Sequence, residues 1–234
     1  MKWNVSRFAL FLVLAAVGGT AAAQNLLVNP NFDSNVAGWS FTTPGTFTWD
    51  SSLDAGSNPL SGSGRLDNTS PATNGTSFAA QCVAVTGGST YDFLAKIRIP
   101  SGQSQTGHAN VVVNFYDGAS CGGSNVGGTA SPIVLSTTTD TWVQSQVLAF
   151  AAPGTAVSAQ VNLWVDKVEA NGSFVVNFDD AAFGLAQSPT PTPTPTSTAT
   201  PTGAAAPVPA TGRGGLLVLF ALLAIAGFFI LRTR

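Results

Sequence analysis

Apolar and polar positions alternate in short segments through the middle of the chain. In residues 91–99, Tyr91, Phe93 and Ile97 alternate with mainly charged side chains. A period of two predicts β-strands that bury one face. The same kind of segment recurs at residues 78–85, 111–116, 142–150, 157–166 and 173–183. Glu, Lys, Leu and Ala at amphipathic helical spacing are missing, so we expect an all-β fold.

Turn-forming residues separate these segments. Asn171-Gly172 is the strongest such signal, because both residues tolerate positive φ in a tight hairpin turn. Many short strands with turns at this spacing predict an antiparallel β-sandwich. Residues 35–76 are less regular and predict long loops with two short strands, near residues 39–42 and 45–49. Long loops on a rigid sandwich commonly carry binding sites.

The two ends of the chain differ from the middle. Residues 1–23 predict a secretory signal peptide, with Lys2 and Arg7 before an apolar stretch and three alanines at residues 21–23 as the cleavage site. An uncleaved N-terminal anchor is the alternative. Residues 187–212 form a Thr/Pro-rich linker, which predicts an extended polyproline II spacer. Residues 24–186 remain as one predicted domain.

The C-terminal tail predicts a surface address. Residues 214–231 form an uncharged apolar run, and two arginines follow it, so residues 213–234 predict a transmembrane helix with a basic cytoplasmic end. Before this run the chain carries a short motif that resembles the sortase substrate L-P-x-T-G and the C-terminal signals of exosortase-like systems, namely Val208, Pro209, Ala210, Thr211 and Gly212. A sorting peptidase that cuts the tail and a simple membrane anchor both remain open. Each alternative places the domain at the cell surface.

Charge and cysteine content further describe the predicted domain of residues 24–186. All 11 acidic residues but only four of the nine basic residues lie in residues 24–186, which gives the domain a formal net charge of −7. A domain this acidic lacks the basic surface that nucleic acid requires. Cys82 and Cys121 are the only cysteines, and in an exported domain they predict one disulfide. Two buried free thiols are the alternative.

Motifs at both ends of the domain resemble those of a known family. Residues 25–33 read Asn-Leu-Leu-Val-Asn-Pro-Asn-Phe-Asp and are followed by Gly38-Trp39, while residues 175–184 read Val-Val-Asn-Phe-Asp-Asp-Ala-Ala-Phe-Gly. Between them lie a Tyr-Asp-Phe segment at residues 91–93 and a Thr-Trp-Val-Gln segment at residues 141–144. This order resembles the CenC-type carbohydrate-binding modules, which are galactose-binding-like jelly rolls.

The resemblance implies a two-sheet jelly roll and a glycan or polysaccharide ligand. It also implies a structural Ca²⁺ ion, held near the two ends of the domain by Asp33 and Asp179. In the alternative, Asp179 and Asp180 make hydrogen bonds that cap the end of a strand. Trp39 and Trp142 occupy motif positions, and we expect both in the core.

Candidate catalytic residues are scarce. His108 is the single histidine and lies in a predicted loop over residues 101–110. Glycoside hydrolysis needs two carboxylates across a cleft, and no pair stands out among the acids. We therefore expect a protein that is not an enzyme. A cryptic hydrolase is a further alternative, for which the sequence offers no acid pair to test first.

Sugar binding, in contrast, has candidate residues. If the apolar residues of segment 157–166 face the core, Trp164 faces outward with Gln160 and Asn162. Tyr116 and Asn114 form a similar outward pair. Aromatic rings stack on sugar rings and amides pair with hydroxyl groups, so these five residues predict a carbohydrate site. Packing of Trp164 beneath a loop is the alternative. Overall, we expect a surface-displayed, non-catalytic carbohydrate-binding module, or else a structural or adhesive matrix protein without a glycan ligand.

Overall fold

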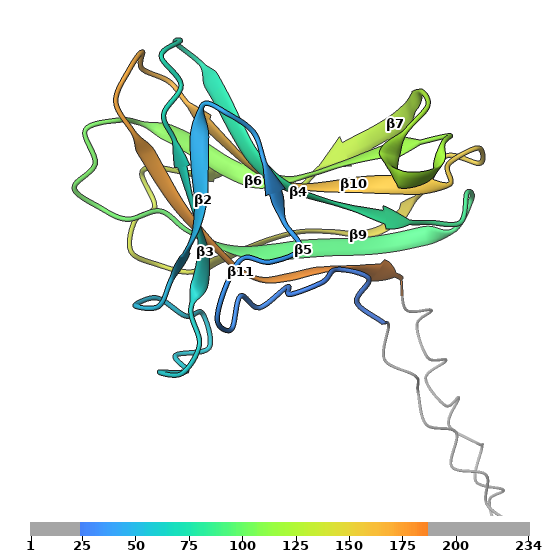
Figure 1. Cartoon of the computed structure of the whole chain (residues 1–234), viewed down its shortest axis with the longest axis horizontal. Helices are drawn as coiled ribbons and strands as arrows, with labels where there is room; N and C mark the ends of the chain where they lie inside the picture. Colours follow the sequence, from blue (N-terminus) through green and yellow to red (C-terminus); the bar gives the residue numbers. More distant parts are fainter. Residues whose placement is uncertain (1–23, 187–234) are drawn as a thin grey trace, which may run out of the picture. The chain divides into compact units, whose positions relative to one another are not determined.

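Two antiparallel β-sheets pack face to face in the computed structural model, which describes residues 24–186 (Figure 1). Sheet A has the order β1 (Ser40–Phe41), β4 (Gly75–Ala84), β10 (Ser158–Lys167), β6 (Gly107–Tyr116) and β7 (Asn125–Ala130), with β8 (Val134–Leu135) also beside β6. Sheet B has the order β2 (Gly45–Asp50), β3 (Ser63–Asn68), β11 (Phe174–Leu185), β5 (Thr90–Arg98) and β9 (Val143–Ala151). The predicted all-β jelly-roll sandwich is confirmed.

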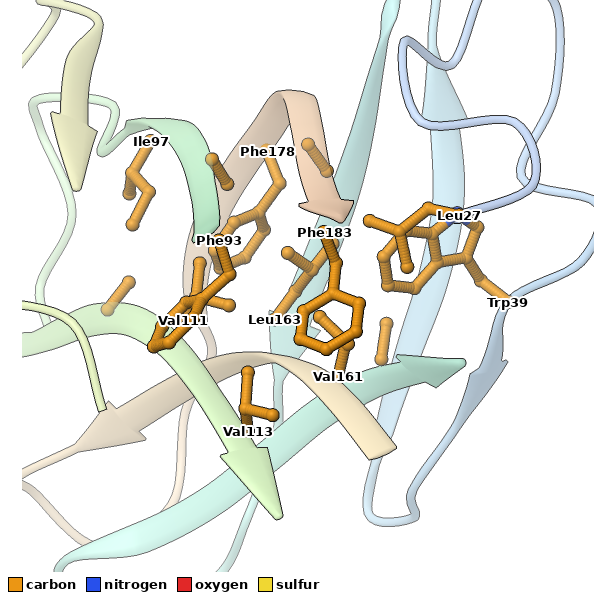
Figure 2. Close-up of a cluster of buried hydrophobic side chains, with 14 of the residues drawn as sticks. Leu27, Trp39, Phe93, Ile97, Val111, Val113, Val161, Leu163, Phe178 and Phe183 are labelled. Atoms are coloured by element: carbon orange, nitrogen blue, oxygen red, sulfur yellow. The ribbon is translucent and has the colours of Figure 1, made fainter. Parts of the chain in front are cut away.

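Inward-facing residues of both sheets make one core (Figure 2). On β10, alternate positions from residue 159 to residue 165 are buried, among them Val161 and Leu163. They face Phe93 and Ile97 of β5 and Phe178 of β11 across the sandwich. Full burial of each large apolar side chain contributes about 1.5–3 kcal/mol, which explains why the strands follow the period of two.

The N-terminal segment closes the sandwich beside the last strand. The Leu26 amide donates to the Phe183 carbonyl at 2.7 Å, and the side chain of Asn25 bonds the backbone of Ala181 and Phe183 at 2.9 and 3.1 Å. Trp39 lies in the core with 8% of its surface exposed, as expected. The opening and closing motifs are therefore neighbours in space.

The structure differs from the sequence predictions at one strand and at one tryptophan. Strand β3 was not predicted, because Leu66 is its only large apolar residue. A Cβ atom at Gly64 of this strand would lie 2.5 Å from the ring of Phe47, so the strand must carry glycine there. The core position expected for Trp142 was wrong. Since Val143 and Ser145 point inward, Trp142 points outward and is half-buried.

The predicted disulfide is present. The Sγ atoms of Cys82 and Cys121 are 1.95 Å apart, and their Cα atoms are 5.9 Å apart. The predicted signal peptide, linker, sorting motif and C-terminal transmembrane helix lie outside the described residues, so they and the domain boundaries stay predictions. Within residues 24–186, no helix has the length and apolar character needed to cross a bilayer.

Candidate functional site

The outward-facing side of sheet A gathers the predicted sugar-binding residues. We call the outward surface of β4, β10 and β6 the A face. Its rows follow from the strand register: Thr76–Asp166–His108, Phe78–Trp164–Asn110, Ala80–Asn162–Val112, Cys82–Gln160–Asn114 and Ala84–Ser158–Tyr116. All five predicted residues lie on this face, and Gln160 is directly opposite Asn114.

Trp164 is half of an aromatic pair. Its ring stacks on that of Phe78 with a centroid distance of 5.1 Å and an interplanar angle of 2°. Both rings are half-buried and stand on neighbouring strands of the A face. Trp164 is therefore half-buried at the surface, and Phe78 covers one face of its indole ring.

Asp166 holds this aromatic pair in place. Its Oδ2 atom accepts a hydrogen bond from Trp164 Nε1 at 2.9 Å and lies 3.1 Å from His108 Nε2. Its Oδ1 atom accepts from the hydroxyl of Thr76. Side chains from three strands therefore converge on one carboxylate, and its hydrogen bond from Trp164 Nε1 fixes the orientation of the indole. His108 lies in β6, so its assignment to a loop was wrong; the strand begins at Gly107.

The remaining predicted residues differ in accessibility. The Tyr116 hydroxyl donates to Gln160 Oε1 at 3.5 Å, and Tyr116, Gln160 and Asn114 are half-buried. Asn162 is fully buried on the central strand, where its Nδ2 atom donates to the carbonyls of Val112 and Gln160 at 3.0 and 3.2 Å. Asn162 can therefore reach no ligand in this conformation, which corrects its predicted role as a contact.

The disulfide fixes a turn over one end of the A face. Cys82 lies in the row of Gln160, and Cys121 ends the short 3₁₀ turn η1 (Ala119–Cys121). The hydroxyl of Ser158 donates to the Gly118 carbonyl at 2.6 Å and accepts from the Cys121 amide at 3.0 Å. This turn lies next to Tyr116 in sequence and bounds that end of the face.

The proposed calcium ligands both make hydrogen bonds within the domain. Asp179 is buried, and its two oxygens accept hydrogen bonds from the backbone amides of Ala55 and Asp180 at 2.7 and 2.8 Å. Asp33 Oδ1 accepts from the Ser61 hydroxyl at 3.1 Å. Between residues 24 and 186, no three His, Cys, Asp or Glu side chains form a group that could hold a metal ion. The contacts of Asp179 match those of a hydrogen-bonding cap, and calcium stays a prediction.

The stability of the domain is expected to increase as pH falls from about 6 to about 4. Burial raises the pKa of Asp179 to about 6, against 3.8 for an ordinary carboxyl. The folded state then binds more protons than the unfolded state in this range, so the free energy of unfolding rises as pH falls. Hydrogen bonds from Ser101 and Thr106 lower the pKa values of Asp140 and Glu169. The contribution of Glu169 begins to be lost as pH falls through 4.5 and that of Asp140 as it falls through 3.8, so the increase is expected mainly between about pH 6 and about pH 4.5.

Urea denaturation of the wild type and Asp179→Asn at several pH values in this range measures the effect. The increase should disappear in the variant, and an increase that persists would mean that another group causes it. A calcium ion would favour the ionised carboxylate. Added CaCl₂ that stabilises only the wild type near neutral pH would therefore support the calcium prediction.

Known proteins share the architecture of this chain. No protein-family profile matches it, and no curated protein matches its sequence. An arabinose-bound α-L-arabinofuranosidase, designated MgGH51, matches 71% of this chain at 18% identity and a TM-score of 0.52, and the match spans only 27% of that enzyme. The similarity extends to the fold alone.

Two carbohydrate-binding modules match nearly all of their own length. The module TmCBM61, bound to β-1,4-galactotriose, matches 70% of this chain and 99% of its own, with 12% identity and a TM-score of 0.48. The C-terminal family 22 module of the Clostridium thermocellum xylanase Xyn10B matches 67% of this chain and 92% of its own, with 17% identity and a TM-score of 0.46. At these values neither match identifies a ligand or a site.

Proposed function

We propose that this protein is a non-catalytic module that binds carbohydrate through the A face. The observation that supports this most is the Trp164–Phe78 ring pair, which stands half-exposed among hydrogen-bonding side chains. The C–H faces of a sugar pack on aromatic rings, and polar groups nearby orient its hydroxyls. Asp166 orients Trp164 before any ligand arrives, which reduces the entropy lost on binding.

The A face favours an oligosaccharide segment over a single sugar. The row of Trp164 and the row of Tyr116 are six residues apart along β6, which corresponds to about 20 Å of strand. Between these rows, Gln160 and Asn114 offer amide groups. The proposed contacts are therefore Trp164, Phe78, Gln160, Asn114 and Tyr116.

Binding without hydrolysis fits the chemistry of this face. Asp166 is the one carboxylate on the described A face, and both of its oxygens accept hydrogen bonds. A glycosidase needs a second carboxylate, at about 5–9.5 Å from the first. We therefore propose that a bound glycan is held and not cleaved.

Trp164→Ala is expected to weaken glycan binding about 10–100-fold, since truncation of a central aromatic anchor costs about 2 kcal/mol or more. A glycan array first selects a ligand, with xylohexaose and β-1,4-galactotriose among the probes. Isothermal titration calorimetry then compares the wild type with the variant.

Trp142→Ala is the matched control, because Trp142 is a half-buried tryptophan that lies just before β9 of sheet B and points away from the core. Its affinity should equal that of the wild type. Equal losses in both variants would contradict the A face as the site. No binding to any glycan on the array would instead favour a structural or adhesive protein.

We further propose that the domain is a distant CenC-type module displayed at the cell surface. The motifs at residues 25–33 and 175–184 support the family, and the linker and apolar tail support display. The tail would either anchor the protein in the membrane or be cut by a sorting peptidase within the motif that begins at Val208. Antibody labelling of intact cells tests display, and the mass of the mature C-terminus separates an anchor from cleavage.

A further inference from the structure

A polar cavity lies outside the A face. Its volume is about 320 Å³, and its walls come from the loop between β5 and β6, the loop after β8, and the start of β11. We infer that this cavity is a second binding site, for one neutral polyhydroxylated unit such as a single sugar residue. The inference is independent of the function proposed for the A face.

One residue of the cavity wall has an unpaired acceptor. Gln105 lines the wall, and its Oε1 atom accepts no hydrogen bond from any residue between 24 and 186. This atom is enclosed, so a ligand in the cavity reaches it only when the side-chain amide turns toward the cavity. A buried acceptor without a donor destabilises the folded state, so a donor is favoured there. On the opposite loop, Ser136 Oγ accepts from the Gly107 amide at 3.1 Å and keeps its own proton to donate. Neighbouring sugar hydroxyls supply both a donor and an acceptor.

Two buried apolar residues support the cavity from beneath. Ile99 and Phe174 adjoin it, but they are only 1% and 0% exposed, so they offer almost no surface to a ligand. A Cβ atom at Gly107 would lie 2.7 Å from the Phe174 ring, so that ring is closely packed in one position. The surface that a ligand can contact therefore consists mainly of Ser, Thr and Gln side chains and backbone, held on a rigid support, and such a surface suits the hydroxyl groups of a sugar.

Charge and size narrow the ligand class. None of the lining residues is charged. At the rim, the carboxylate of Glu169 accepts from the amide and hydroxyl of Thr106, and Asp140 accepts from the Ser101 amide. These acids disfavour a phosphate or another anion. The volume of about 320 Å³ lies at the small end of ligand sites, which favours one small ligand such as a single sugar ring over an oligosaccharide.

Amide chemical shifts in NMR spectra test this site directly. The ¹⁵N-labelled domain is titrated with methyl glycosides of glucose, galactose, xylose and arabinose up to about 50 mM, a range suited to a weak ligand. At least one glycoside is expected to shift the amides of Gln105, Thr106 and Thr137. If none of the four glycosides shifts these amides, the inference is overturned.

Matched variants locate the binding. Thr137→Phe is expected to fill the cavity and weaken binding at least tenfold, and Gln105→Leu to weaken it by removing the acceptor. Thr138→Phe changes the next residue, which does not line the cavity, and should alter affinity less than twofold. Equal effects of Thr137→Phe and Thr138→Phe on affinity would contradict the site.

Trp164→Ala separates this inference from the A face. It should leave the cavity shifts unchanged, even if it abolishes binding of longer glycans. Cavity shifts that disappear in this variant would place the glycoside on the A face and overturn the second site. Dispersed spectra of each variant confirm that it is folded.

Discussion

Removal of the Cys82–Cys121 disulfide is expected to lower the free energy of unfolding by about 4 kcal/mol. The bond closes a loop with a sequence separation of 39 residues. Cross-linking restricts the unfolded chain, and the chain-entropy relation gives about 4 kcal/mol for a loop of this length. The double variant Cys82→Ser, Cys121→Ser leaves no free thiol, and urea denaturation compares it with the oxidised wild type.

The reduced wild type is the control for this prediction. It lacks the cross-link but keeps both sulfur atoms, so its stability should match that of the double variant. A loss below about 1 kcal/mol would mean that the unfolded chain is already restricted in this region. Such a result would contradict a stabilising role for the bond.

The disulfide also connects stability with the proposed site. The turn that ends at Cys121 is held by Ser158 as well, through two hydrogen bonds. We therefore expect the turn to stay near Tyr116 without the bond, but to move more. Loss of the disulfide should therefore weaken glycan contacts at the Tyr116 end of the A face more than those at Trp164, because Asp166 orients Trp164 separately.

The fold could be predicted because its strands contain their own periodic signal. In residues 157–166 apolar and polar types largely alternate along the sequence, and the apolar residues at positions 159, 161, 163 and 165 of β10 are buried as this phase predicts, whereas Val157 is exposed. Asn171-Gly172 also has the conformation that its sequence predicts, since both residues have positive φ. Strand β3 was missed because its pairing with β2 and β11 stabilises it more than its own composition does.

The site could be predicted only in part, because a period of two assigns a face but no register. The alternation placed Trp164 outward, yet its partner Phe78 lies 86 positions earlier in the chain and meets it only through the pairing of β4 with β10. The same pairing, together with β6, brings His108 and Thr76 to Asp166. The sequence of residues 78–85 predicts a strand but assigns no face to Phe78, so the partner of Trp164 had no signal of its own.

Burial on an outward face was the other feature that alternation could not resolve. Asn162 has the outward phase, but strands on both sides and large neighbours along β10 enclose it. Lys167 has the inward phase, at the end of the same strand, and is also fully buried. A charged residue at such a position is unusual and requires partners.

Lys167→Met is expected to lower the free energy of unfolding by about 3 kcal/mol or more, because it removes the donor shared by several carbonyls. The ammonium group donates to the carbonyls of Ser70 and Gly172 at 2.6 and 3.2 Å and to that of Asn171. Methionine keeps the apolar length of the side chain but offers no hydrogen bond. Urea denaturation near neutral pH measures the loss.

Lys96→Met is the matched control, because Lys96 pairs with Asp180 at 2.7 Å on the surface. An exposed pair of this kind contributes about 0–1 kcal/mol. Similar losses in the two variants would show that the buried carbonyls find water when Lys167 is removed. Because Lys167 ties the turns at Ser70 and Asn171 to the strand that carries Asp166, we also expect Lys167→Met to loosen this end of the A face and to weaken glycan binding less than Trp164→Ala does.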